Sequence, residues 1–202
     1  MKKEELKKLI DTAAGRIPAD TVIKNCQIVN VFSGKIQTGD IAFSGDKIAG
    51  IGEYQGVKEI DAQGRYAVPG FIDSHLHLES TLVTPAELVT AASRHGTTTF
   101  IVDPHESANV SGLAGIDYIL DQTEDVKANV YVMMPSCVPA TAIDDNGCTL
   151  TAEDMVPYLH NSRILGLGEV MDSISVVQGE KSMHDKLELF EGRIRDGHAP
   201  FL

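Results

Sequence analysis

The sequence predicts an α/β protein in which a small β module precedes a parallel β-sheet whose strands alternate with helices. Between residues 21 and 68, short β-rich runs are separated by turn signals such as Ser44-Gly45-Asp46. After Pro69-Gly70, strand-like runs alternate with segments of helical periodicity, which is typical of βαβ units. We therefore expect an antiparallel, β-sandwich-like module followed by a parallel sheet.

The expected elements divide the chain into three parts. Residues 1–20 contain a charged amphipathic helix over residues 2 to about 15, residues 21–68 form the β module, and residues 69–202 form the larger α/β part. In this last part strands are expected at 71–74, 97–102, 129–134, 163–167 and, more weakly, 193–195. Helices are expected near 84–95, 112–124, 151–160 and 181–192.

The composition excludes several classes of function. With 17 basic and 29 acidic residues the formal net charge is −12, which disfavours nucleic acid or an anionic membrane as a partner. The sequence contains no apolar run near the length of a membrane span and no secretory signal pattern. Three widely spaced cysteines indicate neither a disulfide framework nor a thiolate zinc site, so we expect a cytoplasmic protein.

Two histidines lie one residue apart at the end of the first strand-like run, in the stretch PGFIDSHLHLES. Side chains alternate between the two faces of a strand, so His75 and His77 point to the same side. A neutral imidazole is a common metal ligand, and such a pair can chelate one Zn, Mn or Fe ion if other segments complete the site. Taken alone, the pattern is as typical of two polar residues that begin a loop.

Polar residues at the ends of the other strand-like runs favour the metal interpretation. The carboxyl ends of parallel strands meet at one edge, where residues distant in sequence become neighbours. Glu169 ends the fourth run after small residues that would let another group approach closely, and its carboxylate could bridge two cations. His198, after the fifth run, would then bind the second ion.

The remaining polar residues at these strand ends are candidates for supporting roles. We expect His105 to have a catalytic role or to contact metal or substrate, although a histidine after Pro104 is also typical of a turn. Asp73 shares the face of His75 and His77 but lies deeper, which favours orienting an imidazole over binding a metal. Roles in orienting ligands or contacting substrate are expected for Asp73, Glu79, Asp103, Glu106 and Asp196.

Several motifs together resemble the amidohydrolase superfamily of metal-dependent hydrolases. A β module followed by VPGFIDSHLHLE is similar to the start of the barrel in that superfamily. More narrowly, the chain resembles the bacterial adenine deaminases in five motifs that follow in the same order. These are HLHLESTLVTPAEL, GTTTFIVDPHESANVSG, MMPSCVPAT, LGLGEVMD and DGHAP, and the likeness covers nearly all of the chain from residue 20 onward.

The resemblance implies a (β/α)8 barrel of the amidohydrolase type that hydrolyses adenine to hypoxanthine and ammonia with a metal-activated hydroxide, in purine salvage or adenine catabolism. By position, His75 and His77 match the ligands of the first strand, Glu169 the bridging carboxylate of the fourth, and His198 the ligand of the fifth. The resemblance also implies a small-molecule substrate and a binuclear centre, with Mn(II) expected first and Fe(II) or Zn(II) as alternatives. Whether the chain forms a homo-oligomer is left open.

The resemblance further implies that the barrel is incomplete, because the chain reaches only about the fifth of eight strands. We therefore expect an amino-terminal fragment that lacks a late histidine and aspartate of the family and whose activity alone is open. Two alternatives also stay open: another amidohydrolase acting on a cyclic amide, and a non-catalytic remnant that only binds metal. Glu169, standing where dihydroorotase-like enzymes carry a carboxylated lysine, disfavours that choice among the cyclic amidases.

Overall fold

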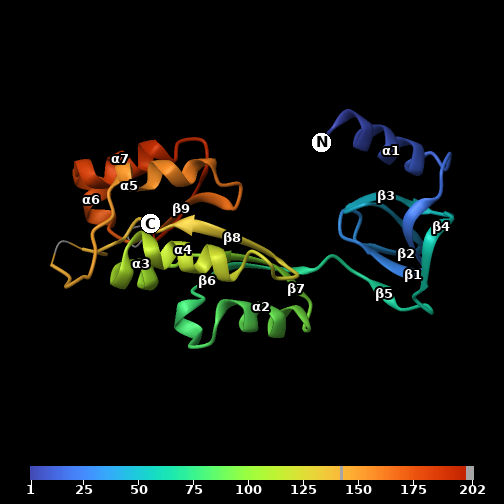
Figure 1. Ribbon diagram of the computed structural model, residues 1–202, viewed down its shortest axis with the longest axis horizontal. Coiled ribbons are helices and arrows are strands. Elements are labelled where there is room, and N and C mark those ends of the chain that lie inside the picture. Colours follow the sequence, from blue (N-terminus) through green and yellow to red (C-terminus); the bar gives the residue numbers. More distant parts are fainter. Residues whose placement is uncertain (142, 199–202) are drawn as a thin grey trace. The chain divides into compact units, whose positions relative to one another are not determined.

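The computed structural model describes residues 1–141 and 143–198, and the chain divides into two compact units, Met1–Pro69 and Gly70–Leu202 (Figure 1). The division lies at the Pro69-Gly70 step, where the periodicity of the sequence changes from short β-rich runs to alternating strands and helices.

The first unit contains one helix and one five-stranded sheet. Helix α1 spans Lys3–Ala13, and the strands are β1 (Ala19–Asn30), β2 (Lys35–Ser44), β3 (Lys47–Gly52), β4 (Gly56–Asp61) and β5 (Tyr66–Ala67). The strand order is β3-β2-β1-β4, and β5 also pairs with β1. The antiparallel prediction holds for β1, β2 and β3 but is wrong for the rest, because β4 and β5 pair with the other edge of β1 and run parallel to it.

The second unit is built on a parallel sheet of five strands in the sequential order β10-β9-β8-β7-β6. The strands are β6 (Phe71–Leu76), β7 (Thr97–Val102), β8 (Asn129–Met134), β9 (Ile164–Val170) and β10 (Ile194–Gly197). All five predicted strands and their parallel pairing are therefore confirmed. Because all five strands run parallel, their carboxyl ends lie along the same edge of the sheet.

Helices follow the strands along the chain, as predicted, with three additions (Figure 1). They are η1 (Glu79–Thr81), α2 (Pro85–Ser93), α3 (His105–Ser111), α4 (Leu113–Gln122), α5 (Ala152–Met155), η2 (Val156–His160), α6 (Ser173–Gln178) and α7 (Lys181–Leu189), where η marks a 3₁₀ helix. The additions are η1, α3 and α6, which were not predicted because all three are short and α6 is rich in β-branched residues. None of the helices in the described part of the chain is both long and apolar enough to cross a membrane.

The main core of the second unit lies between the sheet and its helices. Alternate strand residues, such as Phe100, Val102 and Val132, pack with Val89 of α2 and Ile116 of α4. By alternation, the neighbouring residues of each strand point to the opposite face of the sheet. The strand ends can therefore present polar side chains on that face without disturbing the core.

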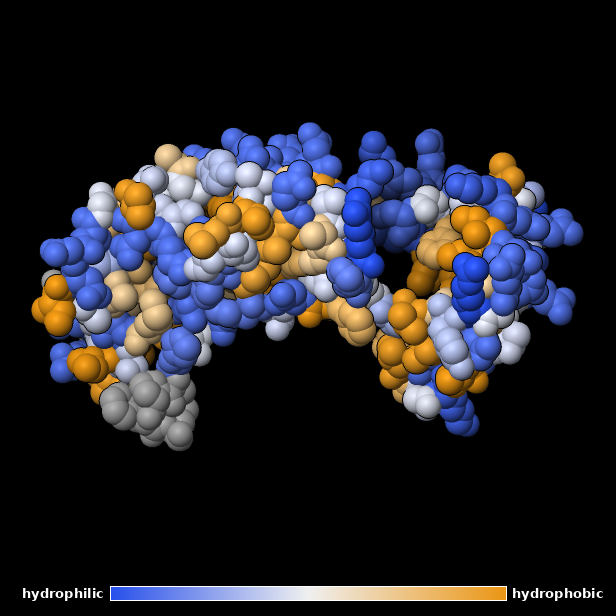
Figure 2. Space-filling model, turned by 90° about the horizontal axis from the view of Figure 1, so that it is seen from below, coloured by the Kyte–Doolittle hydropathy of each residue, from blue (hydrophilic) through white to orange (hydrophobic). Residues whose placement is uncertain are grey.

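Apolar side chains remain exposed on the two edge strands of this sheet. Phe71 and Ile72 on β6 are 67% and 64% exposed, and Ile194 on β10 is 55% exposed. On the face drawn in Figure 2, orange apolar patches lie between blue hydrophilic residues in both units. An incomplete barrel leaves such strands without neighbours, and in the described residues both edge strands do carry exposed apolar side chains.

Candidate metal centre

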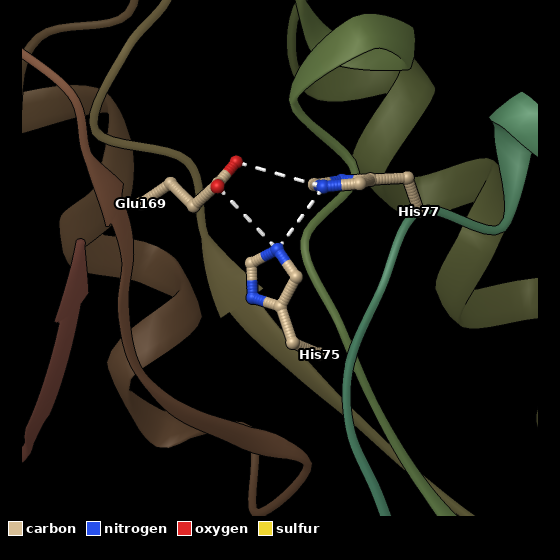
Figure 3. Close-up of side chains that lie close together, drawn as sticks. All are labelled: His75, His77 and Glu169. Atoms are coloured by element: carbon tan, nitrogen blue, oxygen red, sulfur yellow. Dashed lines mark hydrogen bonds and ion pairs between the residues drawn. The ribbon is translucent and has the colours of Figure 1, made fainter. Parts of the chain in front are cut away.

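Three side chains from two strands converge at the carboxyl edge of the parallel sheet (Figure 3). His75 belongs to β6, His77 follows its last residue by one position, and Glu169 lies near the end of β9. The Nε2 atoms of the two imidazoles are 3.1 Å apart. The Glu169 carboxylate faces both of them, with Oε1 3.4 Å from Nε2 of His75 and Oε2 3.6 Å from Nε2 of His77.

Contacts on the far side of each ring determine which nitrogen carries the proton. Nδ1 of His77 lies 2.8 Å from the backbone carbonyl oxygen of Asp103, and Nδ1 of His75 lies 3.1 Å from Oδ2 of Asp196. Both partners are acceptors, so they favour the tautomer in which Nδ1 donates its proton and Nε2 carries the lone pair. Two lone pairs then face one another beside a carboxylate, an arrangement that fits a cation between them.

Glu169 joins these histidines to two more. Its side chain is about 10% exposed, and Oε1 lies 2.9 Å from Nε2 of His198 while Oε2 lies 3.4 Å from Nδ1 of His105. All four predicted metal ligands, His75, His77, Glu169 and His198, thus lie in one cluster. A single carboxylate between two pairs of histidines has the position required of a group that bridges two cations.

His105 begins α3 and is packed between two carboxylates. Its Nδ1 lies 3.6 Å from Oδ1 of the fully buried Asp103, which raises the pKa of His105 in spite of partial burial. Both of these atoms are buried and, in the described part of the chain, neither has a hydrogen-bond partner. Together with Glu169 they form a second group of ligand atoms with the spacing of a metal site. Unsatisfied buried atoms of this kind are expected where an ion is normally held.

The backbone of Glu169 is fixed by two neighbouring side chains. Its N–H donates to Oδ2 of Asp103 over 2.7 Å, and its carbonyl oxygen accepts from the hydroxyl of Ser136 over 2.6 Å. The approach of Asp103 requires glycine at position 168, since a Cβ atom there would lie 2.2 Å from Oδ2. The predicted reason for the small residues before Glu169, close approach of another group, is therefore confirmed at Gly168.

Glu79 and Glu106 lie at the margin of the cluster. Oε1 of Glu79 accepts from the backbone N–H groups of Glu106 and Ser107, so Glu79 binds the first turn of α3, and burial raises its pKa. Oε1 of Glu106 accepts from the hydroxyl of Ser80 over 2.5 Å, although Glu106 is also within ligand distance of His77 and His105. Glu79 thus contacts the helix that carries His105 rather than the ring itself.

Asp73 was expected to orient an imidazole ring, but it contacts the backbone of His75, and Asp196 contacts the ring. Oδ1 of Asp73 accepts from the backbone N–H of His75 over 3.4 Å, whereas the ring of His75 is contacted by Asp196. A cavity of about 490 Å³ lies beside these residues, and Ile101 and Met133 provide apolar parts of its lining. The site therefore combines a polar cluster with an apolar surface that could contact a flat substrate.

Sequence reasoning missed Ser136. It lies two residues after β8, the one strand among β6 to β9 whose end supplied no predicted site residue. Its position at a strand end was a usable signal, because the ends of parallel strands meet at one edge. The adjacent Cys137 is a different case, since burial raises the pKa of its thiol to about 12 and so disfavours a free thiolate near neutral pH.

Comparison with known proteins identifies the family of the chain. The model of the amidohydrolase family matches residues 66–191, which is more than half of the chain. The chain belongs to the amidohydrolase family. The matched segment includes His75, His77, His105 and Glu169, and the parallel sheet is accordingly part of an amidohydrolase-type barrel.

Two curated relatives with similar sequences are named adenine deaminases. An adenine deaminase of Desulfitobacterium hafniense (strain Y51) is 56% identical over 100% of this chain and 36% of its own length. Adenine deaminase 2 of Carboxydothermus hydrogenoformans is 48% identical over 96% of this chain and 34% of its own length. The chain thus spans about a third of the length of these relatives.

A solved structure supports the fold. The atrazine chlorohydrolase of Arthrobacter aurescens TC1, complexed with zinc, matches 68% of this chain and 41% of its own with a TM-score of 0.50 and 18% identity. At this identity the likeness concerns the fold alone.

Proposed function

We propose that this amidohydrolase chain contributes the metal-binding part of an adenine deaminase, which hydrolyses adenine to hypoxanthine and ammonia. The observation that carries the proposal is the convergence of two imidazole lone pairs, on His75 and His77, beside the buried carboxylate of Glu169. The choice of adenine as substrate is supported by relatives that are 48% and 56% identical and are named adenine deaminases.

The side chains that would hold the metal are His75, His77, Glu169 and His198, and the Glu169 carboxylate would be shared because it contacts the other three. Nitrogen and oxygen donors in this mixture suit Mn(II), which we propose first, as well as Fe(II) or Zn(II). When bound, divalent metal supplies a hydrolytic nucleophile near neutral pH. Asp196 and the carbonyl group of Asp103 keep the rings of His75 and His77 in the tautomer that binds metal.

We assign proton transfer to His105 and Glu169. The Asp103 carboxylate favours the protonated form of His105, so this ring can hold a proton and release it to the departing amine. Glu169, 3.4 Å away, can accept a proton from His105 or return one to it. Ile101 and Met133 are proposed to contact the flat face of the purine. A reducing, cytoplasmic setting is supported by the three cysteines, all of which are free thiols.

The test is Mn(II) binding and ammonia release from adenine by the purified chain, beside the double variant His75→Ala/His77→Ala. The unmutated chain is expected to bind Mn(II), and the double variant to lose this binding together with any ammonia release that the unmutated chain shows. His160→Ala/His184→Ala, which removes two exposed histidines, is the matched control and should behave like the unmutated chain.

Three results would count against the proposal. Equal Mn(II) binding by the unmutated chain and the double variant would show that His75 and His77 are not metal ligands. Bound Mn(II) without ammonia release would support a chain that only binds metal. Turnover of dihydroorotate but not of adenine would favour an amidohydrolase that acts on cyclic amides.

A further inference from the structure

The backbone of Glu169 lies beyond the regular pairing of its strand with β8. The pairing of β8 with β9 ends at Met134 and Leu167, two residues before Glu169. From there the N–H and carbonyl groups of Glu169 are bound by the side chains of Asp103 and Ser136. On the β8 side the position of Glu169 therefore depends on these two side chains, whereas on the other side the next residue, Val170, pairs with Gly197 of β10.

Ser136 is itself fixed by a buried lysine. Lys186 of α7 is 6% exposed, and its Nζ donates to the carbonyl oxygen of Ser136 over 2.7 Å. No carboxylate within the described ranges forms a salt bridge with Lys186, and burial lowers the pKa of its amine. Burying an ammonium group is costly, so a lysine in such a place indicates that its hydrogen bond matters.

These contacts form one continuous path from α7 to the metal centre. Lys186 binds the carbonyl of Ser136, the hydroxyl of Ser136 binds the carbonyl of Glu169, and the Glu169 carboxylate faces His75 and His77. Each hydrogen bond measures 2.6 to 2.7 Å. A displacement of Lys186 or Ser136 would therefore be passed on to the Glu169 carboxylate, because all three residues are buried and closely packed.

We propose that Lys186 is a positioning residue of the metal centre, which sets the place of the Glu169 carboxylate through the hydroxyl of Ser136. The inference rests on the metal centre proposed above. Groups that orient a ligand without touching the metal commonly change metal affinity by about 10- to 100-fold when removed.

The test measures Mn(II) affinity by chelator competition for Lys186→Met and Ser136→Ala. Lys181→Met is the matched control, because it makes the same substitution on an 85% exposed lysine of the same helix. Ser136→Thr, which keeps a hydroxyl group, is the conservative variant. Visible spectra of the Co(II)-loaded proteins report ligand geometry, and thermal unfolding of the metal-free proteins reports stability separately.

Lys186→Met and Ser136→Ala are expected to bind Mn(II) about tenfold more weakly and to alter the Co(II) spectrum. Lys181→Met should match the unmutated chain, and Ser136→Thr should recover most of the affinity. If Lys186→Met fails to fold, Ser136→Ala still decides the question. Unmutated affinity and spectrum in Lys186→Met or Ser136→Ala, with or without a lower unfolding temperature, would overturn the positioning role.

The same series separates this inference from the proposed metal centre. If His75→Ala/His77→Ala abolishes Mn(II) binding while Lys186→Met leaves it unchanged, the metal centre stands and the role of Lys186 falls. If the unmutated chain binds no Mn(II), the metal centre is overturned and the positioning role falls with it.

Discussion

At the scale of single residues, the geometry of the metal centre depends on how closely Asp103 approaches the backbone of Glu169. Oδ2 of Asp103 accepts the Glu169 N–H over 2.7 Å, and the missing side chain of Gly168 leaves the space for this contact. The same carboxyl group raises the pKa of His105 through its other oxygen. One buried aspartate therefore acts on two of the proposed active-site residues.

Gly168→Ala is predicted to weaken both the fold and the metal centre. The new Cβ atom would lie 2.2 Å from Oδ2 of Asp103, so the carboxylate must leave the Glu169 N–H unpaired. We expect the free energy of unfolding to fall by about 1–3 kcal/mol, and Mn(II) affinity to fall about tenfold. Chemical denaturation and chelator competition measure the two effects.

The matched control is Gly39→Ala, where the nearest atom would lie 3.7 Å from the new Cβ. This control should leave Mn(II) affinity unchanged. An affinity for Gly168→Ala equal to that of the control would show that the contact between Asp103 and Glu169 does not position the carboxylate.

The sequence predicted those site residues whose placement follows from strand geometry. His75 and His77 share a face because strands alternate, and Glu169 and His198 join them because parallel strands end at one edge. Ser136 and Lys186 could not be found as a pair in this way. Their contact depends on how a loop after β8 packs against α7, which no local periodicity specifies.

At the scale of elements, helix α3 shows where local signals were insufficient. It begins at His105 directly after Pro104 and spans only His105–Ser111, a mainly polar segment without an amphipathic repeat. Two of its first backbone N–H groups are bound by the Glu79 carboxylate, which comes from η1. A tertiary contact from a distant residue thus supports the start of a helix that the segment alone did not predict.

Glu79→Gln is predicted to stabilise the metal-free chain at neutral pH. The amide oxygen of glutamine can still accept from α3, while burial no longer opposes a negative charge. Because the folded-state pKa of Glu79 is raised above 4.5, the fold favours its protonated form, and stability is lost as pH rises through that pKa. The variant should therefore unfold at a higher temperature at pH 7 and show no advantage below pH 4.5.

Thermal unfolding across this pH range in the presence of a chelator checks the prediction, with the exposed Glu87→Gln of α2 as control. A variant that is less stable than the unmutated chain at pH 7 would mean that the charge of Glu79 at the start of α3 outweighs the cost of its burial.

At the scale of the whole molecule, all proposed metal ligands come from the second of two compact units. The five parallel strands were predicted because alternating strand and helix signals are long and regular there. The mixed sheet of the first unit was harder to predict. Pairing of β4 and β5 with β1 joins residues 37 to 39 positions apart, and short β-rich runs do not specify which edge they join.

Metal binding should therefore stabilise the two units unequally. Free Mn(II) at about 100 times its Kd is expected to stabilise a unit that binds it only when folded by about 2.7 kcal/mol. Hydrogen–deuterium exchange should slow in β6, β7 and β9, whereas β1 and β2 of the same sample serve as an internal control and should not change. The protection should vanish in His75→Ala/His77→Ala. Equal slowing of exchange in both units would contradict the assignment of the metal ligands, because all of the proposed ligands belong to the second unit.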